Sequence, residues 1–284
     1  MKSERNKPGL IKQITSPSNT IIKDIKSLQL KKNRDVEGLF VCEGLKLVTD
    51  AVDAGWTMKT LIYARNVTDQ THLMSLATKV RAHGTDLLEV SEKVLGSITR
   101  RDNPQMVVGV FHQKNDDLKN IAPNTNDMWI GLDRVRDPGN LGTIIRTADC
   151  AGATGIILIG ETTDPWSMEA VRATMGSIFN VRIVRCSHKE FGIWRKNWLG
   201  LVIGTHLNGA VDYRSIDYHN KPVLLLMGNE QKGLPDDLVS QCTDNVLIPM
   251  AGKADSLNLA IATGIIAFEA RRTYLKMPEI INDK

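Results

Sequence analysis

The sequence contains no apolar run long enough to span a membrane, and neither its cysteines nor its histidines have the spacing of a metal site. The cysteines lie far apart and form no CxxC pair; they are Cys42, Cys150, Cys186 and Cys242. The polar amino terminus has no apolar stretch behind it, which argues against a secretory signal. We therefore expect no bound metal, no membrane partner and free thiols in a reducing cytoplasm.

The charge of the chain is unevenly distributed. The 284 residues carry a net charge of +4, yet residues 1–34 contain nine Lys/Arg and two acidic residues, a balance of +7. The remaining residues therefore sum to −3. This asymmetry favours a polyanion contacted by the amino-terminal end, although a solvated tail has the same composition.

The first third of the chain alternates between helix-like and strand-like segments. Residues 1–9 are polar and are expected to be disordered. The spacing predicts helices at 18–30, 44–54 and 71–83, and strands at 39–42, 59–63, 87–90 and 106–111. We expect an αβ domain over 1–112, followed by a polar linker at 113–127.

The alternation resumes in a second domain, 128–284. Strands are predicted at 128–132, 155–159, 181–185, 201–205, 223–227 and 246–248, and helices at 141–151, 168–176, 191–198, 236–242 and 257–276. The strands at 156–159 and 223–226 are continuously apolar, which is typical of parallel strands covered on both faces. These patterns alone predict an α/β protein with a doubly wound sheet.

Three polar or glycine-rich loops follow strand-like runs in this second domain. They contain Asn140-Leu141-Gly142-Thr143-Ile144-Ile145-Arg146, then Gly228-Asn229-Glu230-Gln231-Lys232-Gly233-Leu234, then Ile248-Pro249-Met250 with Ser256-Leu257-Asn258. Loops at the carboxyl ends of parallel strands are where ligands bind in α/β sheets. We therefore expect the three loops to form one composite site.

In that order, the three motifs resemble those of the TrmH/SpoU family of RNA ribose 2′-O-methyltransferases, over roughly residues 128–276. The resemblance implies S-adenosylmethionine as cofactor and a deep trefoil knot in the parallel-sheet domain, which sequence patterns cannot indicate. It also implies a homodimer through the carboxy-terminal domain, because the cofactor pocket of such enzymes lies against the second subunit.

The first domain has a resemblance of its own. The runs Ile14-Thr15-Ser16, Lys31-Lys32-Asn33-Arg34 and Leu39–Gly44 are similar to the substrate-binding domain found ahead of many SpoU domains, which resembles a small RNA-binding ribosomal protein. The implied partner is RNA, with large-subunit ribosomal RNA favoured over transfer RNA. A non-catalytic RNA-binding or ribosome-assembly factor with the same fold is the alternative.

The resemblance also indicates which residues hold the cofactor. No Gly-x-Gly-x-x-Gly fingerprint follows the early strands, which disfavours a Rossmann-type site. Glycine lets the backbone approach a ligand closely, a task that we expect of Gly228, although a plain turn glycine is the alternative. The candidate cofactor residues are Thr205, Leu207, Gly228, Asn229, Glu230, Gly233, Ile248, Met250, Ser256, Leu257 and Asn258. Ser256 could instead cap the last helix.

The candidate catalytic residues are Arg146, Asn140 and Glu230. A guanidinium, with a pKa of about 12.5–13.8, is a poor base, so we prefer a role for Arg146 in stabilising the developing alkoxide. Asn140 could also cap the helix that follows it, and Glu230 could orient Arg146 or be a plain loop carboxylate.

Contacts to the RNA backbone are expected from basic residues in both domains. The candidates are Lys31, Lys32, Arg34, Arg134 and Arg136. Trp166, Trp194 and Trp198 could stack on bases, but packing in the core is the better expectation. The histidines are assigned no task.

Overall fold

The computed structural model describes residues 7–67, 70–101 and 103–276. The expected disorder at residues 1–9 therefore falls largely outside the described residues. Gly9 contradicts it, because Gly9 is buried and its N–H donates to the carbonyl of Arg81 at 3.0 Å. The chain forms two compact units, each built from two separate stretches of the sequence.

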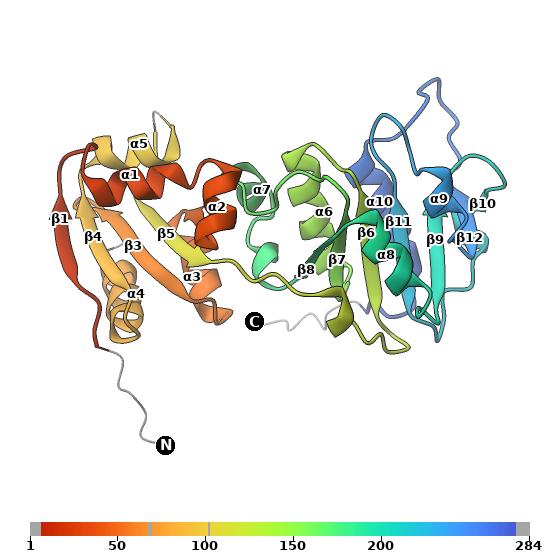
Figure 1. The fold of residues 1–284 in the computed structure, drawn as a ribbon, viewed down its shortest axis with the longest axis horizontal. Helices are drawn as coiled ribbons and strands as arrows, with labels where there is room; N and C mark the ends of the chain where they lie inside the picture. Colours follow the sequence, from red (N-terminus) through yellow and green to blue (C-terminus); the bar gives the residue numbers. More distant parts are fainter. Residues whose placement is uncertain (1–6, 68–69, 102, 277–284) are drawn as a thin grey trace, which may run out of the picture. The chain divides into compact units, whose positions relative to one another are not determined.

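The first unit comprises Met1–Lys114 and Asp164–Asn180. Its five-stranded sheet has the order β1 (Ile11–Ile14), β4 (Asp86–Val90), β3 (Met58–Ala64), β5 (Val107–His112) and β2 (Leu39–Glu43). Its helices are α1 (Thr20–Ser27), α2 (Lys31–Glu37), α3 (Leu45–Asp53), α4 (Gln70–Ala82), α5 (Glu92–Thr99) and α7 (Met168–Ala173). Helices α1 and α5 lie side by side, as do α3 and α4 (Figure 1). The sequence patterns did not indicate β1, α2 or α5.

Residues 164–180, which the sequence patterns place in the second domain, complete the core of the first unit. The rings of Trp166 and Phe40 have centroids 4.9 Å apart, and those of Phe179 and Trp56 are 5.3 Å apart. The indole Nε1 of Trp56 donates to the carbonyl of Phe179 at 3.0 Å. The contiguous boundaries expected from the sequence are corrected here, because large apolar side chains of this segment are buried in the first unit.

The second unit, Asn115–Thr163 with Val181–Lys284, contains a seven-stranded sheet. Its order is β10 (Val211–Asp212), β12 (Asp244–Leu247), β9 (Leu201–Thr205), β11 (Val223–Met227), β6 (Met128–Asp133), β7 (Gly155–Ile159) and β8 (Arg182–Cys186). Every neighbouring pair is parallel, which confirms the parallel α/β sheet predicted from the continuous apolar strands. In Figure 1 these strands are coloured from green to blue.

The helices of the second unit are α6 (Pro138–Cys150), α8 (His188–Arg195), α9 (Asp236–Val239) and α10 (Leu259–Arg271), with short 3-10 turns η1 (Leu118–Asn120) and η3 (Tyr213–Ser215). Helices α6 and α10 pack together (Figure 1), and a methyl carbon of Thr147 lies 3.3 Å from where a Cβ would stand on Gly264. Helix α8 buries Phe191 in an apolar core shared with β6, β7 and β11. None of the described helices is long and apolar enough to cross a membrane.

The polar stretch expected to be a linker packs closely on the second unit. The backbone N–H of Asp116 donates to the carbonyl of Ile183 at 2.9 Å, and Nε of Arg182 donates to the Asp116 carboxylate at 2.6 Å. Leu118 and Ile121 are buried in the apolar core. Residues 115–121 are therefore held against the sheet. The polar composition that suggested a linker did not indicate this packing.

Candidate active site

The three loops meet at one edge of the parallel sheet. Strand β11 lies between β6 and β9, and β12 is the next neighbour of β9. Because all of these strands are parallel, their carboxyl ends lie at the same edge. The three motif loops, which begin at Arg134, Gly228 and Ile248, therefore emerge at one edge, as the order of the motifs predicted. The loop that begins at His206 emerges there too.

A chain of side-chain hydrogen bonds joins one residue from each loop. Nδ2 of Asn258 donates to Oδ1 of Asn140 at 2.9 Å, and Nδ2 of Asn140 donates to Oε1 of Glu230 at 3.4 Å. The two bonds use both ends of the Asn140 amide, so its orientation is defined by its neighbours. Among the described residues Glu230 bonds to Asn140 and Asn229, and it forms no ion pair with Arg146.

The helix caps differ from those predicted. Asp137 caps α6, because its Oδ1 accepts the backbone N–H of Asn140 at 2.6 Å, and Pro138 occupies the first turn. The predicted cap, Asn140, therefore lies inside the helix with its side chain released for the loop contacts. Asn258, rather than the exposed Ser256, caps α10 by accepting the backbone N–H groups of Ala260 and Ile261.

The loop after β11 is closed on itself. Asn229 and Gly233 exchange two backbone hydrogen bonds at 3.1 and 2.9 Å, and Gly233 has a φ of +66° that favours glycine. A Cβ on Gly228 would lie 2.1 Å from the carbonyl carbon of Gly233. Gly228 is therefore required by its own loop. Oδ1 of Asn229 accepts the N–H groups of Gln231 and Lys232, at 3.0 and 3.2 Å.

A pocket of about 190 Å³ opens beside these loops. Of the predicted cofactor residues, those that line it are Thr205, Leu207, Ile248, Met250, Ser256 and Leu257. The sequence did not indicate the other lining residues, His206, Val246, Leu247, Asp255, Ala262 and Ile266. The pocket combines an apolar wall with backbone groups of two loops, which suits the adenine and ribose of a nucleoside cofactor.

Arg146 lies on the solvent-exposed side of α6. Within the described part of the chain its guanidinium has no ion-pair partner, so it is available to a ligand. Asn140 and Arg146 are six residues apart on α6, which places them on different sides of the helix.

The predicted RNA contacts fall into two groups. Lys31, Lys32 and Arg136 are exposed, as a phosphate contact requires. Arg34 is not, because it is only 4% exposed and its Nε donates to Oδ2 of Asp164 at 2.7 Å. The expectation that Arg34 contacts RNA is therefore wrong. This guanidinium is committed to the core of the first unit.

Arg134 belongs to a network that the sequence did not reveal. Its Nε and Nη2 donate to Asp133, with a shortest distance of 2.7 Å, and Nε2 of His188 lies 2.6 Å from Oδ1 of the same carboxylate. Asp133 is completely buried. The hydrogen bonds that Arg134 donates to Asp133 raise the pKa of Arg134 above its ordinary value despite burial, and the charges of Asp133 and Asp237 add to the effect.

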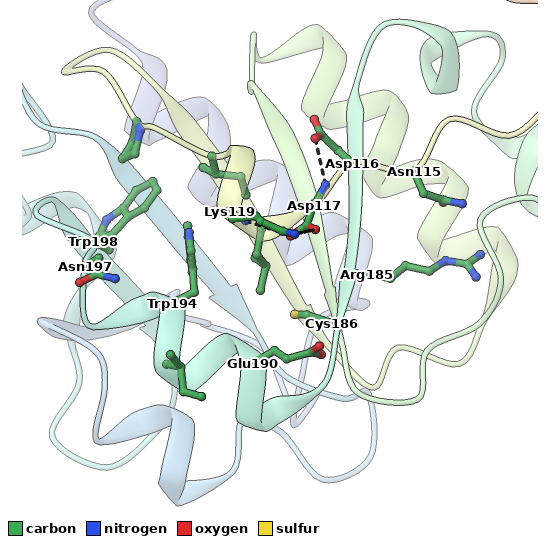
Figure 2. Close-up of a pocket in the computed structure, with 14 residues that line it drawn as sticks. Asn115, Asp116, Asp117, Lys119, Arg185, Cys186, Glu190, Trp194, Asn197 and Trp198 are labelled. Atoms are coloured by element: carbon green, nitrogen blue, oxygen red, sulfur yellow. Dashed lines mark hydrogen bonds and ion pairs between the residues drawn. The ribbon is translucent and has the colours of Figure 1, made fainter.

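A larger pocket, of about 760 Å³, lies between η1 and α8 (Figure 2). Trp194 and Trp198 line it with ring centroids 5.5 Å apart, while Lys119 lies across from them. Trp166 and Trp198 are buried, as expected of core tryptophans. None of the residues of the three motifs lines this pocket. The described residues contain no cluster of side chains suited to a metal ion.

The sequence matches two family models. Residues 127–268 match the SpoU rRNA Methylase family, and residues 19–109 match the MRM3-like substrate binding domain. The chain is 32% identical to the 23S rRNA (guanosine(2553)-2′-O)-methyltransferase RlmP of Bacillus subtilis, over 92% of this chain and all of that protein.

Solved structures agree with this assignment. An AdoMet-bound rRNA methyltransferase from Sinorhizobium meliloti is 56% identical, with a TM-score of 0.87 over 94% of this chain and all of that one. The AdoMet complex of the SpoU methyltransferase AviRb from Streptomyces viridochromogenes is 32% identical, with a TM-score of 0.82 over 90% of this chain and 98% of that one. On its motifs, its fold and these likenesses, the chain belongs to the SpoU rRNA methylase family.

Proposed function

We propose that the protein methylates a ribose 2′-hydroxyl of large-subunit ribosomal RNA. Family membership gives the reaction, which is methyl transfer from S-adenosylmethionine to RNA. The choice of RNA rests on relatives such as RlmP and the 23S rRNA (uridine(2479)-2′-O)-methyltransferase of Streptomyces viridochromogenes. The observation that carries the proposal for the site is the Asn258–Asn140–Glu230 chain, which joins the three loops beside the pocket.

Arg146 acts on the ribose in this proposal. S-adenosylmethionine, when bound, supplies a methyl group already activated by the sulfonium. Transfer would join the 2′-oxygen to the methyl carbon as the carbon–sulfur bond breaks and S-adenosylhomocysteine leaves. The hydroxyl proton would pass to solvent, and negative charge would develop on the oxygen. The unpaired guanidinium of Arg146 stabilises this charge and grips a neighbouring phosphate. Asn140 and Glu230 hold the loops in register around the reacting groups.

The cofactor site is proposed around the small pocket. Backbone groups and apolar side chains there would hold the nucleoside. The loop around Gly228 and Gly233, which does not line this pocket, would border the site on the side of the reacting groups. The full proposed set is Thr205, Leu207, Gly228, Asn229, Glu230, Gly233, Ile248, Met250, Ser256, Leu257 and Asn258. Asn229 contributes mainly by closing its loop, because its side chain is bonded within the protein.

A homodimer would complete this site. A pocket of about 190 Å³ is smaller than the roughly 300–1,000 Å³ that ligand pockets usually offer. Helix α10 is mostly apolar, yet Ile261 and Phe268 are 54% and 44% exposed. Leu257 and Met250 at the pocket are also exposed. A second copy packed on this surface would cover the apolar side chains and enclose the cofactor.

The remaining assignments rest on family likeness. We propose that the first unit is a substrate-binding domain resembling a small ribosomal protein, with Lys31 and Lys32 on RNA phosphates, and that the second unit is the methyltransferase domain. A trefoil knot in the methyltransferase domain and a cytoplasmic location complete the proposal. Solved neighbours with TM-scores of 0.87 and 0.82 support the fold.

The test compares ribose methylation in total RNA from cells with and without the protein, and from cells carrying Arg146→Ala. The expected result is one 2′-O-methyl group in large-subunit ribosomal RNA that disappears without the protein and in the variant. A 2′-O-methyl group that is lost only from transfer RNA would identify transfer RNA as the substrate. If the folded protein binds RNA but transfers no methyl group, the result would favour a non-catalytic assembly factor.

A further inference from the structure

Asp133 is the last residue of β6 and lies beside the proposed site. Its side chain is completely buried, and it accepts hydrogen bonds from two sides. Nε and Nη2 of Arg134 donate to this carboxylate, and Nε2 of His188 lies 2.6 Å from its Oδ1. A carboxylate that accepts a guanidinium fork is ionised and acts only as an acceptor, so Nε2 of His188 is the donor in this pair.

The way Arg134 is held leaves one edge of its guanidinium available. The fork to Asp133 uses the Nε/Nη2 edge, and no other hydrogen bond of this guanidinium is present within the described residues. The second edge, Nη1 with Nη2, has the geometry for two parallel hydrogen bonds to a phosphate. The side chain is 33% exposed, so this edge can reach solvent.

The backbone around Arg134 is built to hold this arrangement. Arg134 has a φ of +49°, a conformation that L-residues rarely adopt, and its carbonyl accepts Nδ2 of Asn229 at 2.8 Å. Gly160 makes room for both partners of Asp133. A Cβ there would lie 2.5 Å from Cε1 of His188 and 3.3 Å from Cγ of Arg134.

We propose that Asp133 and His188 are positioning residues that fix Arg134 as the binding residue for an RNA phosphate beside the target ribose. The proposal rests on the proposed function, because it takes the ligand to be the same RNA. A preoriented guanidinium loses less conformational freedom on binding than an exposed one such as Arg136. His188 acts through Asp133, and its hydrogen bond keeps the carboxylate turned toward Arg134.

The test measures methylation of 23S ribosomal RNA by the full-length protein in three variants. Arg134→Gln removes the charge and is expected to raise KM for RNA about tenfold, with cofactor affinity unchanged. It should also reduce the magnitude of the log–log salt slope of RNA binding by roughly 0.7–0.9. His188→Leu removes the donor and should raise KM about threefold with kcat nearly unchanged, whereas His188→Gln, which offers an amide N–H, should restore most of the affinity.

The decisive comparison is a double-mutant cycle. If His188 acts through Arg134, then His188→Leu adds nothing to the KM of Arg134→Gln. The matched control is Arg214→Gln, because Arg214 makes a similar fork to Asp212 at 2.9 and 2.5 Å but is exposed on η3. Its KM is expected to equal that of the wild type.

Three outcomes would overturn the proposal. Additive effects of the two substitutions on KM would show that His188 acts independently of Arg134. An unchanged salt slope of RNA binding in Arg134→Gln would show that Arg134 contacts no phosphate. A loss of thermal stability in His188→Leu with no change in KM would leave only a structural role. If wild-type protein fails to methylate the RNA, the proposed function fails, while the salt slope of RNA binding still tests Arg134.

Discussion

Replacing Arg34 by alanine should destabilise the protein but should not remove a contact to an RNA phosphate. The guanidinium of Arg34 donates to Asp164 at 2.7 Å and to the carbonyls of Leu28 and Gln29 at 2.7 and 2.8 Å. The side chains of Arg34 and Asp164 are 5% and 4% exposed. Alanine would remove the guanidinium that pairs with the buried Asp164 carboxylate.

The magnitude follows from this burial. Breaking a buried ion pair by removing one partner costs about 3–5 kcal/mol, a large part of the roughly 5–15 kcal/mol by which a domain is stable. At about 2–4 °C per kcal/mol, the melting temperature should fall by roughly 6–20 °C. Adding Asp164→Asn should recover part of the loss, because a neutral amide costs less to bury than a carboxylate.

Urea unfolding and the salt dependence of RNA binding together provide the assay. Lys31→Ala and Lys32→Ala are matched controls, because both residues are exposed on the same helix as Arg34. Each should change stability by less than about 0.5 kcal/mol and reduce the RNA salt slope by roughly 0.7–0.9. The reasoning is refuted if Arg34→Ala is as stable as these controls, or if the folded variant shows the reduced slope of a lost phosphate contact.

Three further predictions concern the second unit. Arg146→Ala and Arg146→Lys should both lower kcat by at least about a hundredfold, with calorimetric affinity for S-adenosylmethionine unchanged; wild-type turnover in either would exclude the proposed role. Gly228→Ala should destabilise the protein and weaken cofactor binding, because the new Cβ meets Gly233 at 2.1 Å, whereas Gly252→Ala, with nothing within 4 Å, should change neither. Ile261→Glu should convert the proposed dimer into monomers in sedimentation experiments and lower cofactor affinity, and an unchanged sedimentation coefficient would place the interface elsewhere.

The parts of the fold that the sequence predicted are those with a strong local pattern. The continuous apolar runs of β7 and β11 indicated covered parallel strands, and both are fully buried in the sheet. Helix α2 had no such pattern, because Val36 is its only large apolar residue and is 83% exposed. Its attachment comes mainly from the buried Arg34, whose partner Asp164 lies 130 residues away. Pairing at that distance leaves no trace in local composition.

The candidate site shows the same division. Motif order predicted that the three loops meet, and the Asn258–Asn140–Glu230 chain joins them. The sequence indicated Ser256 as the possible cap of α10, whereas Asn258 caps it. Both side chains can accept a backbone N–H, and only the course of the chain selects one. Nor could it reveal that His188 meets Asp133, because the two residues are 55 positions apart.

The contribution of residues 164–180 to the first unit has a consequence for the order of folding during synthesis. The sheet strands of that unit are complete once β5 has left the ribosome, but Trp166 and Phe179 have yet to be made. At about 5–20 residues per second, several seconds pass before they can join Phe40 and Trp56. During that interval the nascent chain exposes an aromatic surface, and any truncation between the two halves would make that exposure permanent.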